Sequence, residues 1–136
     1  MLIYDYNNSY VYISFINNDN LKLTIVDSPG YGFANRSTAE IKSWEKMMQE
    51  YISTSDNLKS IIILIDSEHG ITNLDEGLVK LASYKLIELV VVFTKCDKLR
   101  TEEYYNMRVG EARILITKGK TLCNYIFFTS SNNMIG

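Results

Sequence analysis

The chain contains few of the residues on which several classes of protein depend. Its 136 residues include two cysteines, one histidine and one proline. The cysteines, Cys96 and Cys123, do not form a CxxC pair, so we expect neither a structural zinc site nor a secreted disulfide scaffold. No apolar run is long enough to cross a membrane. No secretory signal peptide is predicted either, because polar sequence follows Met1.

An excess of charge of one sign is also missing. The 16 acidic and 14 basic residues give a formal net charge of −2, so no basic patch for nucleic acid is predicted. Hydrophobic residues make up 46% of the chain and charged residues 22%, as in ordinary globular proteins. Because no Gly/Ser-rich linker or internal repeat interrupts it, residues 1–136 are predicted to form one domain.

The pattern of apolar residues predicts strands that alternate with helices. Five segments have the composition of strands: 11–16, 21–26, 61–65, 87–93 and 125–129. The first two are joined by an Asn-rich turn and should form a hairpin. Three helices should begin at capping residues, which are Ser37, Thr72 and Thr101.

Alternation of this kind implies a three-layer α/β domain with a mostly parallel sheet. Every residue of 61–65 is apolar, so this strand should be buried on both faces. The buried face of the helix after Thr101 is expected to consist of Tyr105, Val109, Ala112 and Ile116. Ligands of such sheets bind beyond the carboxyl ends of the strands. The chemistry should therefore lie just after Val26, Ile65, Phe93 and Thr129.

Asp27, Ser28, Pro29 and Gly30 follow the second strand. A carboxylate at a strand tip can hold a hydrated Mg²⁺ ion, and the glycine lets a backbone N–H approach a phosphate oxygen. The same residues are also ordinary turn residues that end a strand. Taken alone, the segment fits both interpretations.

The segments after the two last strands suit the recognition of guanine. A fixed Asp97 can accept hydrogen bonds from the N1–H and N2–H₂ groups of guanine, a donor pair that adenine lacks. The aliphatic stem of Lys95 can lie along the base. Backbone N–H groups in the polar turn of Ser130, Ser131 and Asn132 can meet the guanine O6. Residues 94–98 can also be read as an ordinary charged loop that precedes a helix and binds no ligand.

The order of these segments resembles that of GTP-binding domains, and in particular of the EngB-type GTPases. Residues 27–34, DSPGYGFA, resemble the DxPGYGYA/F signature of that family. Residues 64–72, LIDSEHGIT, resemble its LIDxRHGPT segment, with Glu68 in place of Arg and Ile71 in place of Pro. Residues 94–98, TKCDK, match its TKxDK motif. The resemblance covers nearly the whole chain.

The resemblance implies a P-loop-NTPase-like G domain that binds GTP or GDP together with Mg²⁺. Asp27 would hold Mg²⁺ through water, and Gly30 would contact the γ-phosphate. The guanine site would be formed by Thr94, Lys95, Asp97, Lys98, Ser130, Ser131 and Asn132. Many GTPases carry a Gln or His that positions the attacking water where this chain has Tyr31. An aromatic ring cannot polarise water in that way, so unaided GTP hydrolysis should be slow. The alternative is that Tyr31 only packs at the start of a loop.

EngB-type proteins act in assembly of the large ribosomal subunit, so the implied partner is a precursor of that subunit. The implied compartment is the cytoplasm in a bacterium, and the mitochondrion or plastid in a eukaryote. No membrane partner is expected.

The phosphate-binding motif GxxxxGK[S/T] does not occur in the sequence, because none of the seven glycines begins one. We therefore expect residues 1–136 to be a partial G domain, incomplete at both ends, which runs from the end of switch I to the Ser-rich turn. Without the phosphate-binding loop, this chain is expected to bind GTP, GDP and Mg²⁺ weakly. Strands 21–26 and 61–65 would then flank an absent strand. Two hypotheses stay open: a Mg²⁺-dependent GTPase as the full-length parent, with this chain inactive alone, or a non-catalytic binding module.

Overall fold

The computed structural model of the chain describes residues 2–4, 11–16, 22–28, 37–120 and 125–134. Its contacts divide the chain into two compact units, residues 1–44 and 45–136. The described residues form six strands, three α-helices and one short 3₁₀ helix. Among them, no helix is both long and apolar enough to span a membrane.

The first unit contains an antiparallel sheet with the strand order β1-β2-β3. β2 (Val11–Ile16) pairs with β3 (Lys22–Asp27) over its whole length, so the predicted hairpin is confirmed. Its turn lies outside the described residues. The added strand β1 (Leu2–Tyr4) pairs with β2. Sequence analysis did not predict β1, because three residues are too few to carry a periodic pattern.

Helix α1 (Thr38–Thr54) begins directly after the predicted capping residue. The backbone N–H of Glu40 donates to Ser37 Oγ at 3.3 Å, and the backbone N–H of Ser37 donates to the Glu40 carboxylate at 2.7 Å. Two N–H groups at the start of the helix therefore have partners. The buried side chains of the helix include Trp44, Met48 and Ile52, which recur at helical spacing on one face.

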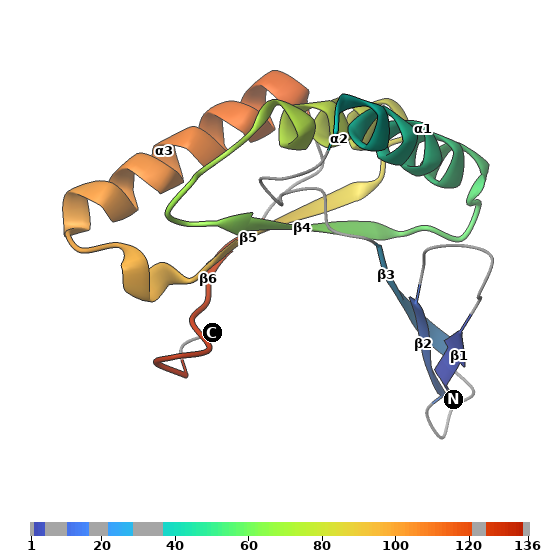
Figure 1. Ribbon diagram of the computed structural model, residues 1–136, viewed down its shortest axis with the longest axis horizontal. Helices are drawn as coiled ribbons and strands as arrows, with labels where there is room; N and C mark the ends of the chain where they lie inside the picture. Colours follow the sequence, from blue (N-terminus) through green and yellow to red (C-terminus); the bar gives the residue numbers. More distant parts are fainter. Residues whose placement is uncertain (1, 5–10, 17–21, 29–36, 121–124, 135–136) are drawn as a thin grey trace. The chain divides into compact units, whose positions relative to one another are not determined.

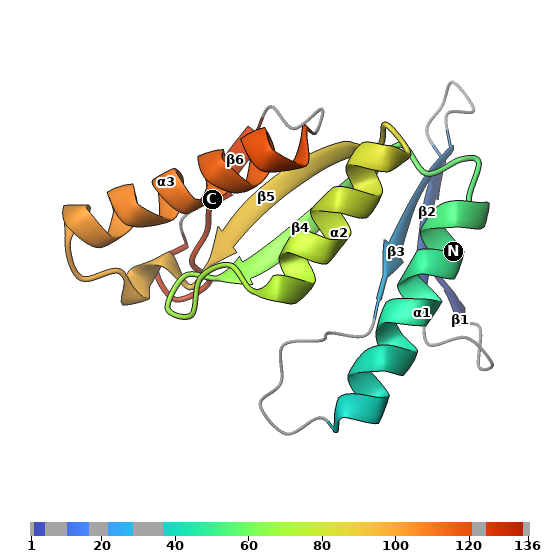
Figure 2. The same ribbon diagram turned by 90° about the horizontal axis from the view of Figure 1, so that it is seen from above.

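The second unit contains a parallel sheet with the strand order β4-β5-β6. The three strands are β4 (Ser60–Asp66), β5 (Glu88–Thr94) and β6 (Tyr125–Phe128). Helices α2 (Asn73–Tyr84) and α3 (Glu102–Gly119) lie on the same face of this sheet (Figures 1 and 2). The predicted α/β fold class with a parallel sheet is confirmed, whereas the predicted three layers are not seen in the described residues of this unit, where α2 and α3 cover one face of the sheet.

One face of this sheet forms the core of the second unit. The most deeply buried strand side chains on it are Ile63, Ile65, Leu89, Val91 and Phe93. The prediction that strand 61–65 is buried on both faces is wrong for the described residues, since Ile62 and Leu64 are 61% and 65% exposed. Successive side chains of a strand point to opposite faces, and α2 and α3 cover only one of them.

Both later helices begin at their predicted caps. At α2, the Thr72 N–H donates to the Asp75 carboxylate at 2.7 Å, and the Asp75 N–H donates back to Thr72 Oγ1 at 3.4 Å. At α3, Thr101 Oγ1 accepts a hydrogen bond from the backbone N–H of Tyr104 at 3.4 Å. Local capping thus sets the start of both helices.

The predicted buried face of α3 is wrong in part. Its buried residues are Arg108, Ala112 and Leu115, whereas Tyr105 is 42% exposed, and Val109 and Ile116 are only half-buried. An arginine occupies this face because its guanidinium finds hydrogen-bond acceptors there, in the turn after β4.

Strands β3 and β4 belong to separate sheets. Among the described strands, β3 pairs with β2 and β4 pairs with β5, so the two do not pair with each other. The expectation that they flank an absent strand stays a prediction.

Candidate functional site

The loop after β5 is tied to the end of β6 by backbone hydrogen bonds. Lys95 follows β5 in the left-handed conformation, with a φ of 55°, and the 3₁₀ helix Cys96–Lys98 comes next. The Cys96 N–H donates to the Thr129 carbonyl at 3.0 Å, and the Thr129 N–H donates to the Phe93 carbonyl at 2.8 Å. The segment that contains Asp97 therefore lies next to the segment that begins at Ser130.

Both carboxylate oxygens of Asp97 accept hydrogen bonds from this neighbouring segment. The Ser130 hydroxyl donates to Oδ1 at 2.6 Å, and the Asn132 amide donates to Oδ2 at 3.0 Å. The bonds from Ser130 and Asn132 hold the pKa of Asp97 below its usual value. Each oxygen of a carboxylate can accept two hydrogen bonds, so an ionised and oriented Asp97 can still bind two donors from a ligand.

The structure brings four of the predicted guanine-site residues together: Lys95, Asp97, Ser130 and Asn132. The remaining three have other surroundings. The Thr94 hydroxyl donates to the carbonyl of Ile65 at 3.2 Å, and Lys98 and Ser131 are exposed. Asn132 was predicted as a nucleotide contact, and its side chain contacts Asp97.

The predicted phosphate and metal segment begins in the first unit. Asp27 is the last residue of β3, and its side chain is exposed. An exposed carboxylate at a strand end fits a hydrated Mg²⁺, which takes oxygen ligands and keeps several waters. Gly30 and Tyr31 lie outside the described residues.

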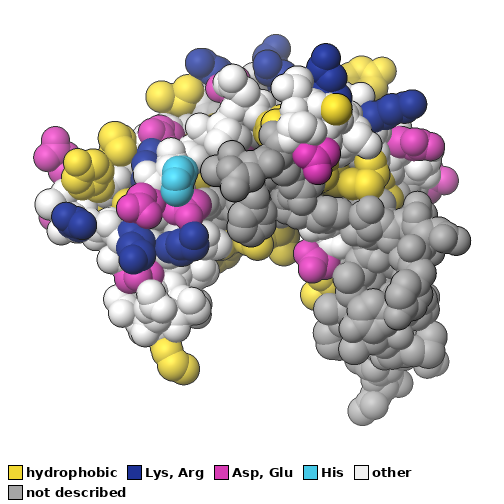
Figure 3. Space-filling view, viewed as in Figure 1, with side chains coloured by type: hydrophobic (Ala, Val, Ile, Leu, Met, Phe, Trp, Pro, Cys, Tyr) yellow, Lys and Arg dark blue, Asp and Glu magenta, His cyan; other side chains and the backbone are white. Residues whose placement is uncertain are grey.

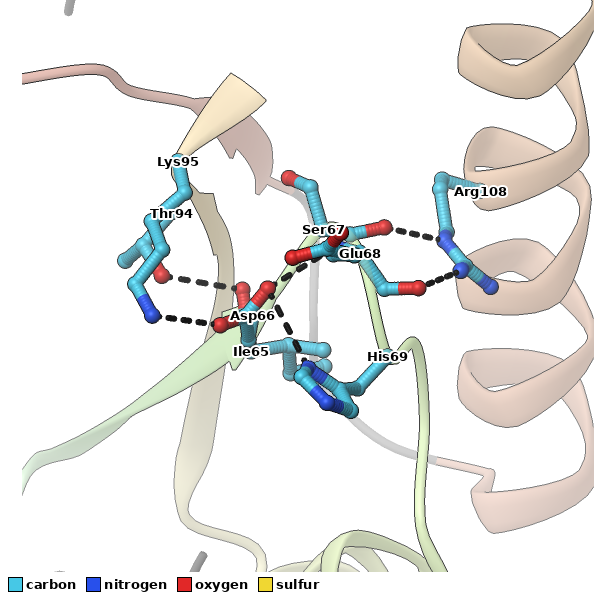
Figure 4. Close-up of polar contacts among 8 residues, drawn as sticks. All are labelled: Ile65, Asp66, Ser67, Glu68, His69, Thr94, Lys95 and Arg108. Atoms are coloured by element: carbon cyan, nitrogen blue, oxygen red, sulfur yellow. Dashed lines mark hydrogen bonds and ion pairs between the residues drawn. The ribbon is translucent and has the colours of Figure 1, made fainter. Parts of the chain in front are cut away.

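A second polar cluster lies at the tip of β4, beside Lys95 (Figure 4). The Lys95 ammonium donates to Asp66 Oδ2 at 2.6 Å, and the Glu68 N–H donates to Asp66 Oδ1 at 2.8 Å. Partial burial by itself would raise the pKa of Asp66, but Lys95 and the Glu68 N–H bring it below its usual value. The hydrogen bond and charge of Asp66 raise the pKa of Lys95.

Sequence reasoning did not select Asp66 as a site residue. Two signals pointed to it: its position directly after a buried strand, where ligands of parallel sheets bind, and its place in the LIDSEHGIT segment. Its partner, Lys95, could not be predicted from the sequence. Lys95 is far from Asp66 in sequence, and only the pairing of β4 with β5 places Asp66 opposite Thr94.

The tip of β4 also offers possible metal ligands. Asp66, Glu68 and His69 each present a ligand atom within 4.8 Å of the others, and Figure 3 shows side chains of both charges around the histidine. Glu68 and His69 are exposed, and the Asp66 carboxylate already has the Lys95 ammonium as its cation. We therefore assign no metal to this group.

Arg108 of α3 donates hydrogen bonds to backbone carbonyls of the turn after β4. Arg108 is 7% exposed. Its Nε donates to the Ser67 carbonyl at 2.7 Å, and its Nη2 donates to the Glu68 carbonyl at 2.8 Å. Nη1 pairs with Glu111 at 2.8 Å. Gly70 closes the turn with a φ of 79°, and a Cβ atom there would lie 2.2 Å from Nη1.

The chain is similar in sequence to known GTP-binding proteins. A family profile described as 50S ribosome-binding GTPase matches residues 8–95. A probable GTP-binding protein EngB from Rickettsia prowazekii (strain Madrid E) is 38% identical over 111 residues, which are 82% of this chain and 50% of that protein. A probable GTP-binding protein EngB from Ruegeria sp. (strain TM1040) is 32% identical over 110 residues, which are 81% of this chain and 50% of that protein. The chain thus spans about half the length of the curated relatives it matches.

Among solved structures, the chain is similar to translation elongation factor SelB from Methanococcus maripaludis in its apo form. The TM-score is 0.65 at 21% identity, and the match covers 90% of this chain and 24% of that protein. At this identity the likeness concerns the fold alone, and it agrees with the α/β arrangement described above.

Proposed function

Because the chain belongs to the family of 50S ribosome-binding GTPases, we propose that its second unit binds the guanine base of GTP or GDP. Its curated relatives are EngB-type proteins, which agrees with the resemblance of its motifs. One observation carries the proposal: Asp97 stands at the carboxyl end of β5 with one oxygen held by Ser130 and the other by Asn132.

Each residue of this cluster has a proposed role. Asp97 accepts the N1–H and N2–H₂ groups of guanine, and it selects against adenine, which has an acceptor at N1 and no amino group at C2. The aliphatic stem of Lys95 lies along the base. A backbone N–H in the turn at Ser131 donates to the guanine O6. Ser130 and Asn132 hold the Asp97 carboxylate in place.

The phosphate side of the nucleotide is proposed from family resemblance. We propose that Asp27 holds Mg²⁺ through water and that Gly30 contacts the γ-phosphate. Tyr31 is proposed to lie at the water-positioning place. When bound, Mg²⁺ neutralises charge on the phosphates.

For the protein as a whole we propose GTP hydrolysis coupled to assembly of the large ribosomal subunit. The proposed compartment is the cytoplasm for a bacterial protein, and the mitochondrion or plastid for a eukaryotic one.

Calorimetry with the purified chain tests the guanine assignment. GDP should bind more tightly than ADP, and Asp97→Asn should weaken GDP binding by about 10- to 100-fold, since hydrogen bonds to charged groups contribute about 1.5–3 kcal/mol. The same variant should gain affinity for xanthosine diphosphate, whose C2 oxygen suits an amide donor. Asp56→Asn is the matched control, because Asp56 precedes β4 at the opposite end of the sheet.

Two results would overturn the assignment. One is equal binding of ADP and GDP by the unaltered chain. The other is GDP binding that is the same in the Asp97→Asn variant and the Asp56→Asn control.

A further inference from the structure

The side chain of Lys95 has a specific partner on the neighbouring strand. Its ammonium donates to Asp66 Oδ2 at 2.6 Å, and Figure 4 shows the lysine side chain directed toward the tip of β4. The Lys95 side chain is 61% exposed, whereas that of Asp66 is 24% exposed. The end of the lysine is thus bound while much of its stem stays open to a ligand.

The Asp66 carboxylate is itself held in one orientation. Its Oδ1 accepts the Glu68 N–H at 2.8 Å, and its backbone carbonyl accepts the N–H groups of His69 and Gly70 at 3.2 and 2.9 Å. Arg108 binds the next two carbonyls of the same turn. A buried side chain of α3 therefore fixes the turn, the turn fixes the carboxylate, and the carboxylate fixes the lysine.

The backbone of Lys95 also restricts where this side chain can go. Its φ of 55° is in the left-handed region, which is unfavourable for a residue with a Cβ atom. The Lys98 N–H donates to the Lys95 carbonyl at 2.9 Å, so Lys95 and Asp97 belong to one tight turn. The stem of the lysine consequently begins beside the carboxylate proposed to bind guanine.

We propose that Asp66 is a positioning residue for guanine binding, which acts by holding the Lys95 stem in the place where the base stacks. This inference rests on the proposed function of the second unit. Asp66 does not touch the base itself, and its contribution passes through Lys95. The raised pKa of Lys95, caused first by its hydrogen bond to Asp66 and then by that residue's charge, agrees with a lasting pair.

A double-mutant cycle with GDP binding as the readout tests the proposal. Asp66→Asn should weaken GDP binding by about two- to fivefold, the range expected for a partly exposed ion pair. In a Lys95→Met background, which keeps an apolar stem but has no ammonium, the same substitution should have no further effect. Glu68→Gln removes an acidic charge from the same turn without breaking a hydrogen bond of Lys95, and it should leave binding unchanged.

The ratio of GDP to xanthosine diphosphate affinity separates this role from that of Asp97. Asp66→Asn should lower both affinities equally, since the lysine stem contacts the face of the base and not its edge. A loss that persists in the Lys95→Met background would show that Asp66 acts through the fold, and the proposal would be wrong. Tighter GDP binding by Asp66→Asn would also overturn it, since the ion pair would then compete with the nucleotide.

A nucleotide-free measurement separates failure of this inference from failure of the proposed function. The pKa of the Lys95 ammonium, followed by the NMR shift of Cε, should lie above the usual lysine value and should fall more in Asp66→Asn than in Glu68→Gln, because the hydrogen bond and charge of Asp66 raise it more than the charge of Glu68 does. If the unaltered chain does not bind GDP, the proposed function is wrong, and the positioning role is wrong with it. If the chain binds GDP but the Lys95 pKa is the same in Asp66→Asn, only the positioning role is wrong.

Discussion

Replacing Gly70 by alanine should destabilise the turn that holds Asp66. A Cβ atom at Gly70 would lie 2.2 Å from Nη1 and 2.7 Å from Cζ of Arg108, far inside van der Waals contact. The left-handed backbone at this position adds about 1–2 kcal/mol for a residue with a Cβ atom. Arg108 can move away only by giving up bonds to the Ser67 and Glu68 carbonyls, at about 1–3 kcal/mol for each buried group left unpaired.

The expected loss is therefore about 3–8 kcal/mol when both carbonyls lose their partner, a large part of the roughly 5–15 kcal/mol that stabilises an ordinary domain. Urea unfolding of the chain, followed by circular dichroism, measures it. Gly77→Ala is the matched control, because Gly77 is inside α2 and a Cβ atom added there would meet nothing within 4 Å. Alanine at that position should stabilise by about 0.5–1 kcal/mol. Equal unfolding midpoints for the two variants would refute the reasoning.

Three further predictions concern stability, protonation and catalysis. Arg108→Met should lower the unfolding free energy by about 2–6 kcal/mol, because it leaves the Ser67 and Glu68 carbonyls without their partner, at about 1–3 kcal/mol each; Arg113→Met, at an exposed position of the same helix, should change it by less than about 0.5 kcal/mol, and similar losses for both would contradict the assigned contacts. Ser130→Ala should raise the pKa of Asp97, measured by carboxyl ¹³C titration, because the Ser130 hydroxyl is the first cause of its lowered value. Since the folded-state pKa is below the unfolded one, the stability from this bond is complete above the unfolded pKa and is lost as the pH falls through the folded value; an unchanged pKa in the variant would count against the bond. The purified chain should hydrolyse GTP no faster than buffer, because no GxxxxGK[S/T] occurs in its sequence and phosphate positioning supplies most of the rate; phosphate release that disappears in Asp27→Ala would be the contrary result.

The features that sequence analysis predicted correctly depend on neighbours along the chain. Helix starts at Ser37, Thr72 and Thr101 follow from side chains that bond backbone N–H groups within the next turn. The hairpin of β2 and β3 follows from two strand-like runs around a polar turn. Asp97 and Ser130, which are proposed to form the guanine site, lie together because parallel strands bring their carboxyl ends to one edge.

The features that it missed depend on partners far away in sequence. Periodicity assigns a charged residue such as Arg108 to the solvent face of a helix, and only the carbonyls of Ser67 and Glu68 make its burial favourable. The apolar run 61–65 indicates a strand that is able to be buried on both faces. It does not say which elements cover each face, and among the described residues Ile62 and Leu64 remain exposed.

The candidate site consists of ion and hydrogen-bond pairs that join neighbouring strand ends, and β5 is common to both. Lys95 after β5 bonds Asp66 at the end of β4, and Asp97 bonds Ser130 after β6. The parallel register sets both pairs, since it places Asp66 opposite Thr94 and Phe93 opposite Phe128. A shift of either neighbour by one residue would turn its side chains to the other face. The order β4-β5-β6 therefore does more than build a core. Lys95 and Asp97 both follow β5, and each is held by a residue from a different neighbouring strand end, Lys95 by Asp66 of β4 and Asp97 by Ser130 after β6.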